Sequence, residues 1–159
     1  MNPIKKNKFS IIFNHDGYAK LAEYINKNNF KKILILTDDN TKKNCLHIFI
    51  SSLSPTNNQV LNQINSKLFH YSVKPGENSK NIETSIELWK FLIDKGFKRS
   101  DLIINLGGGM ITDLGGFVAS TFMRGVKFIN VPTTLLGMVD ASIGGKTGID
   151  YMEIKNIIG

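Results

Sequence analysis

Short apolar runs alternate along the chain with longer segments in which apolar residues recur at helical spacing. Residues 32–37 and 101–106 form continuous, branched apolar runs, which are typical of strands buried on both faces of a sheet. Further strands are expected at residues 9–13, 67–73 and 127–131.

Helices are expected between these runs, at residues 18–28, 41–52, 81–95 and 110–121. In the clearest of them Ile82, Ile86, Trp89 and Ile93 recur at helical spacing, and Gly96 stands where a helix commonly ends. This alternation over 159 residues predicts one α/β domain, built as a parallel sheet with helices on its faces.

Three segments are less regular. After the strand at 127–131, Thr133 is expected to cap a short helix that carries Leu135, Leu136 and Val139. Residues 51–65 are polar and are expected to form a surface excursion. Residues 144–159 are rich in glycine and poorly periodic, with nothing after them to pack against. We therefore expect residues 1–159 to be a truncated chain or the product of a split gene.

The formal net charge of +7 raises the question of nucleic-acid binding. Lysine outnumbers arginine 18 to 2, the lysines are scattered, and the chain holds 17 asparagines. Nucleic-acid-binding proteins favour arginine and clustered basic faces with aromatic side chains between them. The charge is therefore expected to be compositional, with no nucleic-acid partner. Strongly salt-dependent binding of DNA or RNA would show the opposite.

Cys45 is the only cysteine, so no disulfide can form within the chain, and a buried structural role is expected for it. His15, His47 and His70 lie in different elements, at spacings that do not suggest a shared metal. The sequence lacks both a signal peptide and an apolar run long enough to cross a bilayer. We expect a cytoplasmic protein with no membrane partner.

A run of three glycines, Gly107 to Gly109, separates a predicted buried strand from a predicted helix. Such a turn lets the backbone approach a pyrophosphate, and the free N–H groups of the following helix can bind the anion. The strict dinucleotide fingerprint needs a further glycine at the position of Thr112, so a simple tight turn remains an alternative.

Polar residues follow two of the other predicted strands. Asp38 and Asn40 come directly after the strand at 32–37, where a carboxylate can accept hydrogen bonds from a ribose. Asn40 could instead cap the next helix. Glu77 and Lys80 lie in one turn before the helix at 81–95, where a surface ion pair would also explain them.

The segment Gly144–Gly148 contains Gly-Lys-Thr, but it is not a triphosphate-binding loop because Asp140 occupies the position of the required glycine. Lys146, Lys155, Asn156 and Arg124 could together hold a phosphate or a carboxylate, although each alone would more often be a solvated surface residue.

Together these segments resemble the 3-dehydroquinate synthase family. The resemblance depends on Pro75-Gly76-Glu77-x-x-Lys80, on Gly107-Gly108-Gly109-x-x-x-Asp113, on the stretches 124–136 and 139–148, and on Lys155-Asn156. It is strong from Lys74 onward and weak before it, where mainly residues 37–40 match. It implies a Rossmann-like NAD-binding domain, normally followed by a helical domain that is absent here.

The resemblance also implies where NAD is bound. The matching residues fall in three groups: Asp38, Asn40, Glu77 and Lys80 at the nucleoside and ribose; Gly108, Gly109, Met110, Thr133 and Thr134 at the pyrophosphate and adenine; and Asp113 at the nicotinamide ribose.

The substrate side of the site follows in the same way. Asp140 and Lys146 match residues at the junction of nicotinamide and substrate, and Lys146 and Asn156 match ligands of the substrate phosphate. Lys155 lines the same pocket, so Lys146 and Lys155 would border both cofactor and substrate. Arg124 matches an arginine that is lent to the neighbouring subunit's active site, which implies a homodimer.

The implied reaction converts 3-deoxy-arabino-heptulosonate 7-phosphate, a phosphorylated sugar acid, to 3-dehydroquinate and phosphate in the shikimate pathway. It proceeds through a transient oxidation by enzyme-bound NAD. A divalent metal, zinc or cobalt, polarises the hydroxyl that is oxidised. The family's metal ligands, one glutamate and two histidines, lie after the region matched here. No metal site is therefore expected in this chain, and no useful turnover is expected from it alone.

Two alternatives remain from the sequence. The chain could belong to a related sugar-phosphate cyclase or a metal-dependent polyol dehydrogenase, although Lys155-Asn156 and the stretch 132–136 favour a cyclase. It could also be a non-catalytic NAD-binding fragment. One departure from the family's pattern is Asp150, which stands where many members have asparagine.

Overall fold

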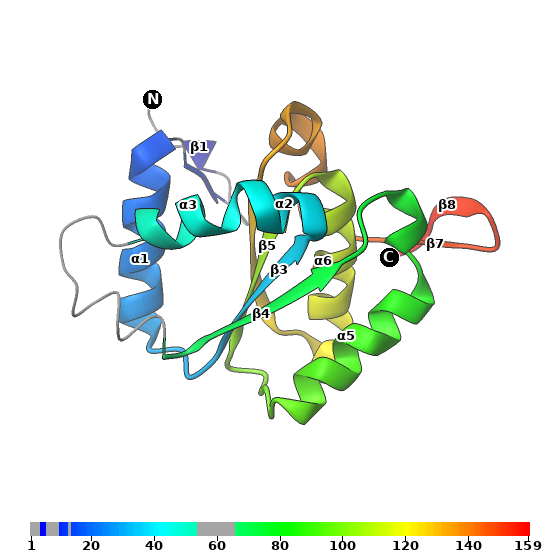
Figure 1. Ribbon diagram of the computed structural model, residues 1–159, viewed down its shortest axis with the longest axis horizontal. Coiled ribbons are helices and arrows are strands. Elements are labelled where there is room, and N and C mark those ends of the chain that lie inside the picture. Colours follow the sequence, from blue (N-terminus) through cyan, green and yellow to red (C-terminus); the bar gives the residue numbers. More distant parts are fainter. Residues whose placement is uncertain (1–3, 6–9, 13, 54–65) are drawn as a thin grey trace.

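The computed structural model describes residues 4–5, 10–12, 14–53 and 66–159. Its strands are β1 (Ile4–Lys5), β2 (Ser10–Ile11), β3 (Ile33–Asp38), β4 (Leu68–Val73), β5 (Leu102–Gly107), β6 (Lys127–Pro132), β7 (Ile149–Tyr151) and β8 (Ile154–Ile158) (Figure 1). Its helices are α1 (Asn14–Asn28), α2 (Asp39–Asn44), α3 (Leu46–Ser52), α5 (Ile82–Asp94) and α6 (Gly109–Thr121), with short helical segments η1 (Glu77–Ser79), η2 (Phe122–Arg124) and η3 (Gly137–Ala141).

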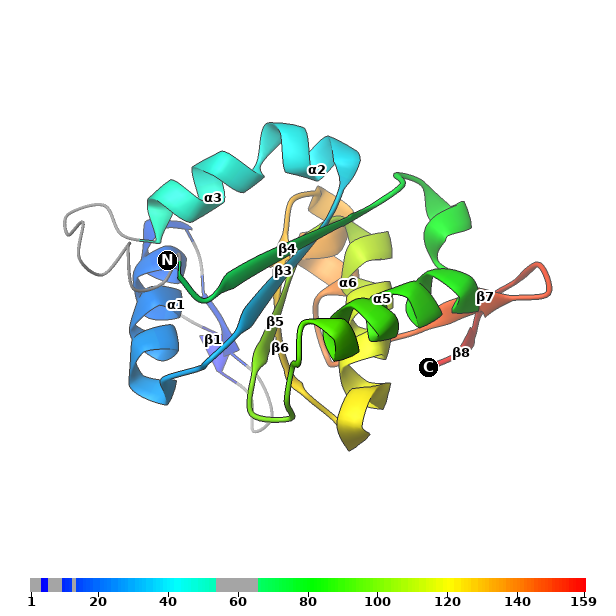
Figure 2. The same cartoon turned by 60° about the horizontal axis from the view of Figure 1, so that its bottom comes forward.

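Four parallel strands form the central sheet in the order β4-β3-β5-β6, which confirms the predicted α/β class. Helices α1 and α3 cover one face of this sheet, and α5 and α6 cover the other (Figures 1 and 2). The chain leaves β3 toward the first face and leaves β5 toward the second. The carboxyl ends of these two neighbouring strands therefore form a topological switch point, where open α/β sheets usually bind their ligands.

Alternate side chains of β3 build a separate core on each face of the sheet. Leu34 and Leu36 pack with α5 and α6, whereas Ile33 and Ile35 pack with α1 and α3. All four side chains are at most 1% exposed. A strand that is apolar on both faces must be covered on both, so the branched runs in the sequence demanded helices on each side.

The apolar residues whose spacing predicted α5 are not all buried. Ile86 and Ile93 are 41% and 63% exposed, and the face that packs on the sheet consists of Ser85, Leu88 and Leu92. The helix carries two apolar stripes, and helical spacing alone cannot decide between them. The ends of the helix were predicted well. The side chain of Asn81 caps its start by accepting a hydrogen bond from Thr84 N, and Gly96 follows its end.

Other boundaries also differ from the predictions. The helix expected at 41–52 is two helices, α2 and α3, separated at Cys45, which is half-buried rather than buried. The strand expected at 9–13 is β2, which spans only Ser10–Ile11, and residues 9 and 13 lie outside the described residues. Most of the expected surface excursion, 54–65, also lies outside them. Residues 149–158, expected to be poorly periodic, form the antiparallel hairpin β7–β8. No described helix is long and apolar enough to cross a membrane.

Close packing against the sheet fixes the position of α6. A Cβ atom added at Gly115 would lie 2.0 Å from Asn105 Oδ1, in the middle of β5. Asn105 is fully buried and donates a hydrogen bond to Asn130 Oδ1 on β6 at 2.9 Å, so it cannot move aside freely. The absence of a side chain at 115 therefore allows α6 to lie directly on β5 and β6.

Replacing Gly115 with alanine is expected to lower the free energy of unfolding by about 1–3 kcal/mol, the usual cost of overpacking a core. Urea denaturation of the variant measures this loss. Gly17→Ala in α1 is the matched control, because its Cβ would meet only ordinary contacts, the nearest at 3.5 Å. The control should be neutral or stabilising by up to about 1 kcal/mol, since alanine favours helix. Equal effects of the two changes would contradict close packing at α6.

Candidate functional site

The residues predicted to contact the cofactor gather at the carboxyl edge of the sheet. Asp38 ends β3, the glycine run follows β5 and begins α6, and Thr133 and Thr134 follow β6. The backbone joins two of these segments, since Thr133 N donates to Gly107 O at 3.0 Å. Three loops that are distant in sequence thus meet at the switch point.

The amino end of α6 can bind an anion. Its N-cap residue, Gly108, offers no side-chain hydrogen bond to the first turn, so the N–H groups of that turn are directed at the edge of the sheet without a capping side chain. The helix is 13 residues long. Thr134 borders this turn closely, because a Cβ atom at Gly108 would lie 3.1 Å from Thr134 Cγ2. Backbone donors without a capping side chain, beside small residues, are typical of an anion site.

The expected cap by Thr133 is wrong. The residue that caps the segment after β6 is Thr134, whose Oγ1 accepts a hydrogen bond from Gly137 N at 3.2 Å. Thr133 is bound through its own backbone to β5, so its position before the helix is already fixed. Leu135, Leu136 and Val139 on this segment are 63–75% exposed and do not pack into the core.

Asp38 has a structural role in addition to any contact with a ligand. Its Oδ1 accepts a hydrogen bond from Thr41 N at 2.8 Å and its Oδ2 accepts one from Thr41 Oγ1 at 3.1 Å. Asp38, and not Asn40, therefore caps α2, and Asn40 lies inside the helix. Each carboxylate oxygen has two lone pairs, so Asp38 can cap the helix and still accept a bond from a ribose hydroxyl.

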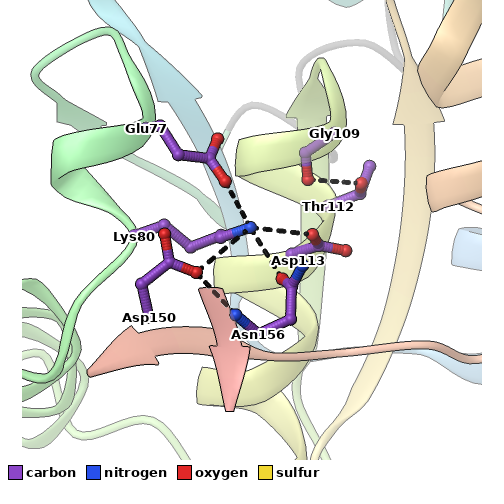
Figure 3. A network of polar contacts seen from close by, with 7 residues as sticks. All are labelled: Glu77, Lys80, Gly109, Thr112, Asp113, Asp150 and Asn156. Atoms are coloured by element: carbon purple, nitrogen blue, oxygen red, sulfur yellow. Dashed lines mark hydrogen bonds and ion pairs between the residues drawn. The ribbon is translucent and has the colours of Figure 1, made fainter. Parts of the chain in front are cut away.

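A buried lysine gathers the other predicted polar residues (Figure 3). Lys80 is 3% exposed, and its Nζ lies 2.5 Å from Glu77 Oε1 and 3.4 Å from Asp113 Oδ2. It also donates to Asn156 Oδ1 at 2.8 Å and lies 3.5 Å from Asp150 Oδ1. We call these five residues the Lys80 cluster. They come from η1 and the turn after it, from α6 and from both strands of the hairpin.

Charge and burial shift the pKa values within the Lys80 cluster. Burial alone would lower the pKa of Lys80, but the hydrogen bond and charge of Glu77, together with Asp113 and Asp150, outweigh it and raise that pKa. Burial raises the pKa of Asp113, and the attraction of Lys80 only partly opposes this shift. Shifted pKa values of this kind gather at functional sites and also in structural ion-pair networks.

Asp113 is expected to cost stability at neutral pH. Its pKa in the folded state is raised, so the folded protein holds a proton more tightly than the unfolded chain does. The penalty is fully present above the folded pKa, and it disappears as the pH falls below the unfolded value of 3.8. Asp113→Asn should therefore raise the unfolding free energy at pH 7, with an advantage that shrinks toward pH 3.

Denaturation of this variant and of the wild type across the pH range measures that difference. Glu153→Gln, at an exposed residue, is the control and should leave the unfolding free energy at pH 7 unchanged. A lower stability of Asp113→Asn at pH 7 would mean that its pairing with Lys80 outweighs its desolvation.

The loop around Lys146 lies on the same side of the sheet as the glycine turn. Gly148 N donates to Asp113 O at 3.4 Å, and a Cβ atom at Gly116 would lie 2.5 Å from Thr147 Cγ2. Lys146 Nζ donates to Asp140 Oδ1 at 2.6 Å, and both side chains are more than half exposed. This hydrogen bond raises the pKa of Lys146, and the charge of Asp113 adds to the shift. The predicted substrate and cofactor sides therefore share one edge.

The remaining predicted residues differ in their placement. Met110 lies in the first turn of α6 and packs on the adjoining core, and Lys155 is exposed on β8. Arg124 lies in η2, at the opposite end of α6 and hence at the other edge of the sheet. The length of α6, about 20 Å, separates it from the glycine turn. The structure therefore does not bring Arg124 to the site of its own chain.

Sequence reasoning missed the role of Asp150, which it treated as a variation without consequence. Asp150 is part of the Lys80 cluster because β7 and β8 form a hairpin, and no periodic pattern indicated that hairpin. Among the histidines, His70 Nε2 lies 2.9 Å from Thr37 Oγ1, and burial lowers its pKa. The described residues contain no group of three or more His, Cys, Asp or Glu side chains that could hold a metal ion.

Comparisons with known proteins agree with this geometry. Residues 70–159 match the model of the 3-dehydroquinate synthase N-terminal family. The chain is 41% identical over 157 residues to 3-dehydroquinate synthase of Clostridium botulinum, which covers 98% of this chain and 43% of the relative. It is 61% identical over 87 residues to 3-dehydroquinate synthase of Sulfolobus acidocaldarius, which covers 55% of this chain and 25% of the relative.

A solved structure has the same fold. The 2-epi-5-epi-valiolone synthase from Streptomyces hygroscopicus subsp. jinggangensis, with NAD⁺ and Zn²⁺ bound, superposes with a TM-score of 0.72 at 25% identity. The match covers 100% of this chain and 42% of that protein. The chain thus spans less than half the length of the curated relatives that it matches.

Proposed function

Because this chain belongs to the 3-dehydroquinate synthase family, we propose that it forms the NAD-binding part of an enzyme that makes 3-dehydroquinate. The substrate would be 3-deoxy-D-arabino-heptulosonate 7-phosphate, and phosphate would be the second product. The observation that carries this proposal is the meeting of the uncapped start of α6, Asp38 and the Lys80 cluster at one edge of the sheet.

The proposed NAD contacts follow from the chemistry of each group. The first-turn N–H groups of α6 and the Thr133–Thr134 turn bind the pyrophosphate. Glu77, whose side chain is 42% exposed, supplies an acceptor for ribose hydroxyls, and Asp113 accepts from the nicotinamide ribose. The ammonium group of Lys80 faces Glu77, Asn156 and Asp113, so its part is to hold these side chains in place. When bound, NAD supplies the hydride acceptor for a transient oxidation of the substrate. The chain's own part is to orient the cofactor against the loop that carries Lys146.

The proposed substrate contacts are cationic and amide side chains on the hairpin and the preceding loop. Lys146, Lys155 and Asn156 bind the phosphate or carboxylate of the sugar acid. Asp140 accepts a hydrogen bond from Lys146 at 2.6 Å, which restrains the ammonium group beside the site. This arrangement positions a multiply charged substrate next to the nicotinamide end of the cofactor.

Arg124 supports the proposal of a homodimer. It lies at the edge of the sheet opposite the site of its own chain, so it can serve an active site only in a second copy. Guanidinium groups suit such a task because they bind phosphate through two parallel hydrogen bonds. The proposed dimer would therefore share Arg124 between subunits.

The ligands of the metal ion are proposed to lie outside this chain. The described residues contain no group of three or more His, Cys, Asp or Glu side chains that fits a divalent ion. The side chains of Leu135, Leu136, Met138 and Val139 are 50–75% exposed on one short segment. Such an apolar patch is typical of a surface that packs against another part of a protein. We propose that a helical domain carrying the metal ligands packs against this patch.

The cytoplasmic location expected from the sequence stays a prediction.

An assay of phosphate release from the heptulosonate phosphate tests the proposed activity. The chain alone is expected to give no release above background, whereas the chain supplemented with the helical domain of a related synthase, NAD and Zn²⁺ should release phosphate. Oxidation of glycerol under the same conditions is the control for a polyol dehydrogenase. Glycerol oxidation without phosphate release would refute the synthase assignment, and phosphate release at full-enzyme rates by the chain alone would refute the need for a second domain.

A further inference from the structure

Hairpin β7–β8 carries two of the proposed substrate contacts, but little apolar packing holds its second strand. Ile149 of β7 is fully buried in the core beneath α5 and α6, whereas every residue of β8 is exposed. Ile154 and Ile157 are 57% and 55% exposed. The position of β8 therefore depends on its hydrogen bonds.

Asp150 forms a closed set of contacts that fixes β8 (Figure 3). Its backbone N donates to Lys80 O at 2.8 Å, and its Oδ1 accepts a hydrogen bond from Asn156 N at 2.8 Å. Lys80 Nζ in turn donates to Asn156 Oδ1 at 2.8 Å and lies 3.5 Å from Asp150 Oδ1. Asp150 thus contacts the turn before α5 on one side and β8 on the other.

The backbone of Asn156 adopts a conformation that favours this support. Its φ of +53° lies in the left-handed region, which asparagine adopts more readily than most residues but less readily than glycine. Asp150 accepts the N–H of this residue, and Lys80 binds its side-chain oxygen. The backbone N–H and the side-chain oxygen of Asn156 are therefore both held in position relative to Lys80.

We propose that Asp150 is a positioning residue: its Oδ1 fastens β8 to Lys80 and so holds Lys155 and Asn156 beside the cofactor edge. That Lys155 and Asn156 contact a substrate beside a bound cofactor rests on the proposed function. The attachment of β8 to Lys80 through Asp150 does not. The hydrogen bond at 2.8 Å carries the effect more than the charge does, because the ion-pair distance to Lys80 is 3.5 Å. Asparagine, which keeps the acceptor, should therefore replace Asp150 without loss.

Amide hydrogen exchange on the 159-residue chain tests the fastening without any ligand. Asp150→Ala should speed exchange in residues 154–158 by about tenfold, the factor expected for the loss of one good hydrogen bond. Asp150→Asn should stay within about twofold of the wild type. Glu153→Gln, an exposed carboxylate in the same hairpin, should also match the wild type and controls for charge alone. Unchanged exchange in residues 102–107 of β5 shows that each variant is folded.

Calorimetric titration with NAD measures whether the loss of the Asp150 side chain also disturbs the NAD site at Lys80. Asp150→Ala should weaken NAD binding by about fivefold, and Asp150→Asn should restore it. Wild-type exchange rates in Asp150→Ala would overturn the proposal. So would an Asp150→Asn variant as fast as Asp150→Ala, or an equal effect of Glu153→Gln. If no variant and not even the wild type binds NAD, the proposed function fails, while the exchange rates still decide the role of Asp150.

Discussion

Replacing Lys80 with methionine is expected to lower the free energy of unfolding by about 3 kcal/mol. Methionine has a similar length but no charge, so the change leaves Glu77, Asp113 and Asp150 around a site with no cation. Breaking a buried ion pair from one side typically costs about 3–5 kcal/mol, because the remaining charges lose their partner. The lower figure applies because the three carboxylates are 18–42% exposed and can regain water.

Lys146→Met is the matched control for this loss. Lys146 also pairs with an aspartate, at 2.6 Å, but both side chains are more than half exposed. An exposed pair of this kind contributes little to stability, because water and salt screen it. Guanidinium chloride denaturation of the two variants should therefore separate them clearly. Similar losses for Lys80→Met and Lys146→Met would show that the Lys80 cluster does not behave as a buried network.

Replacing Gly109 with aspartate is expected to weaken NAD binding by about 100-fold or more while leaving the fold intact. The new carboxylate would stand in the first turn of α6, where the pyrophosphate is proposed to bind, and would repel it. The same position favours an acidic residue in the free protein, because it interacts well with the helix dipole. Space is available, since a Cβ atom at Gly109 would meet Ala141 at an ordinary contact distance of 3.4 Å.

Gly109→Ala separates charge from size in this test. It adds the Cβ atom without the carboxylate, and its NAD affinity should fall by no more than about tenfold. Calorimetry measures both affinities, and thermal unfolding without ligand should show Gly109→Asp to be at least as stable as the wild type. Equal NAD affinity of the aspartate variant and the wild type would place the pyrophosphate elsewhere.

The elements of the sheet could be predicted from the sequence because their patterns have a single interpretation. The run at 32–37 is too short for a core helix and too apolar for an edge strand, so it had to be a central strand, and β3 confirms it. Asn81 and Gly96 marked the ends of α5 because each has a specific chemistry at a helix terminus. The strand order could not be predicted from the same patterns, since it depends on which strands pair.

Most residues of the candidate site could be predicted from the sequence, but the contacts between them could not. Glu77, Lys80 and Asp113 were each marked by a motif, yet nothing in the sequence indicated that one buried ammonium group contacts both carboxylates. Asp150 was missed because an isolated hairpin of three and five residues leaves only a weak alternating pattern. The buried face of α5 could not be predicted from spacing alone either, because Ile86 and Ile93 are apolar but exposed.

A calorimetric titration of the 159-residue chain with NAD tests most directly whether the switch point is a cofactor site. The geometry at the start of α6 and at Lys80 predicts saturable binding of one NAD per chain, with a dissociation constant of about 10 µM or tighter. ADP-ribose, which keeps the pyrophosphate and both riboses, should compete for the same site. A titration without saturation at millimolar NAD, from protein whose β5 amides remain protected, would contradict the assignment.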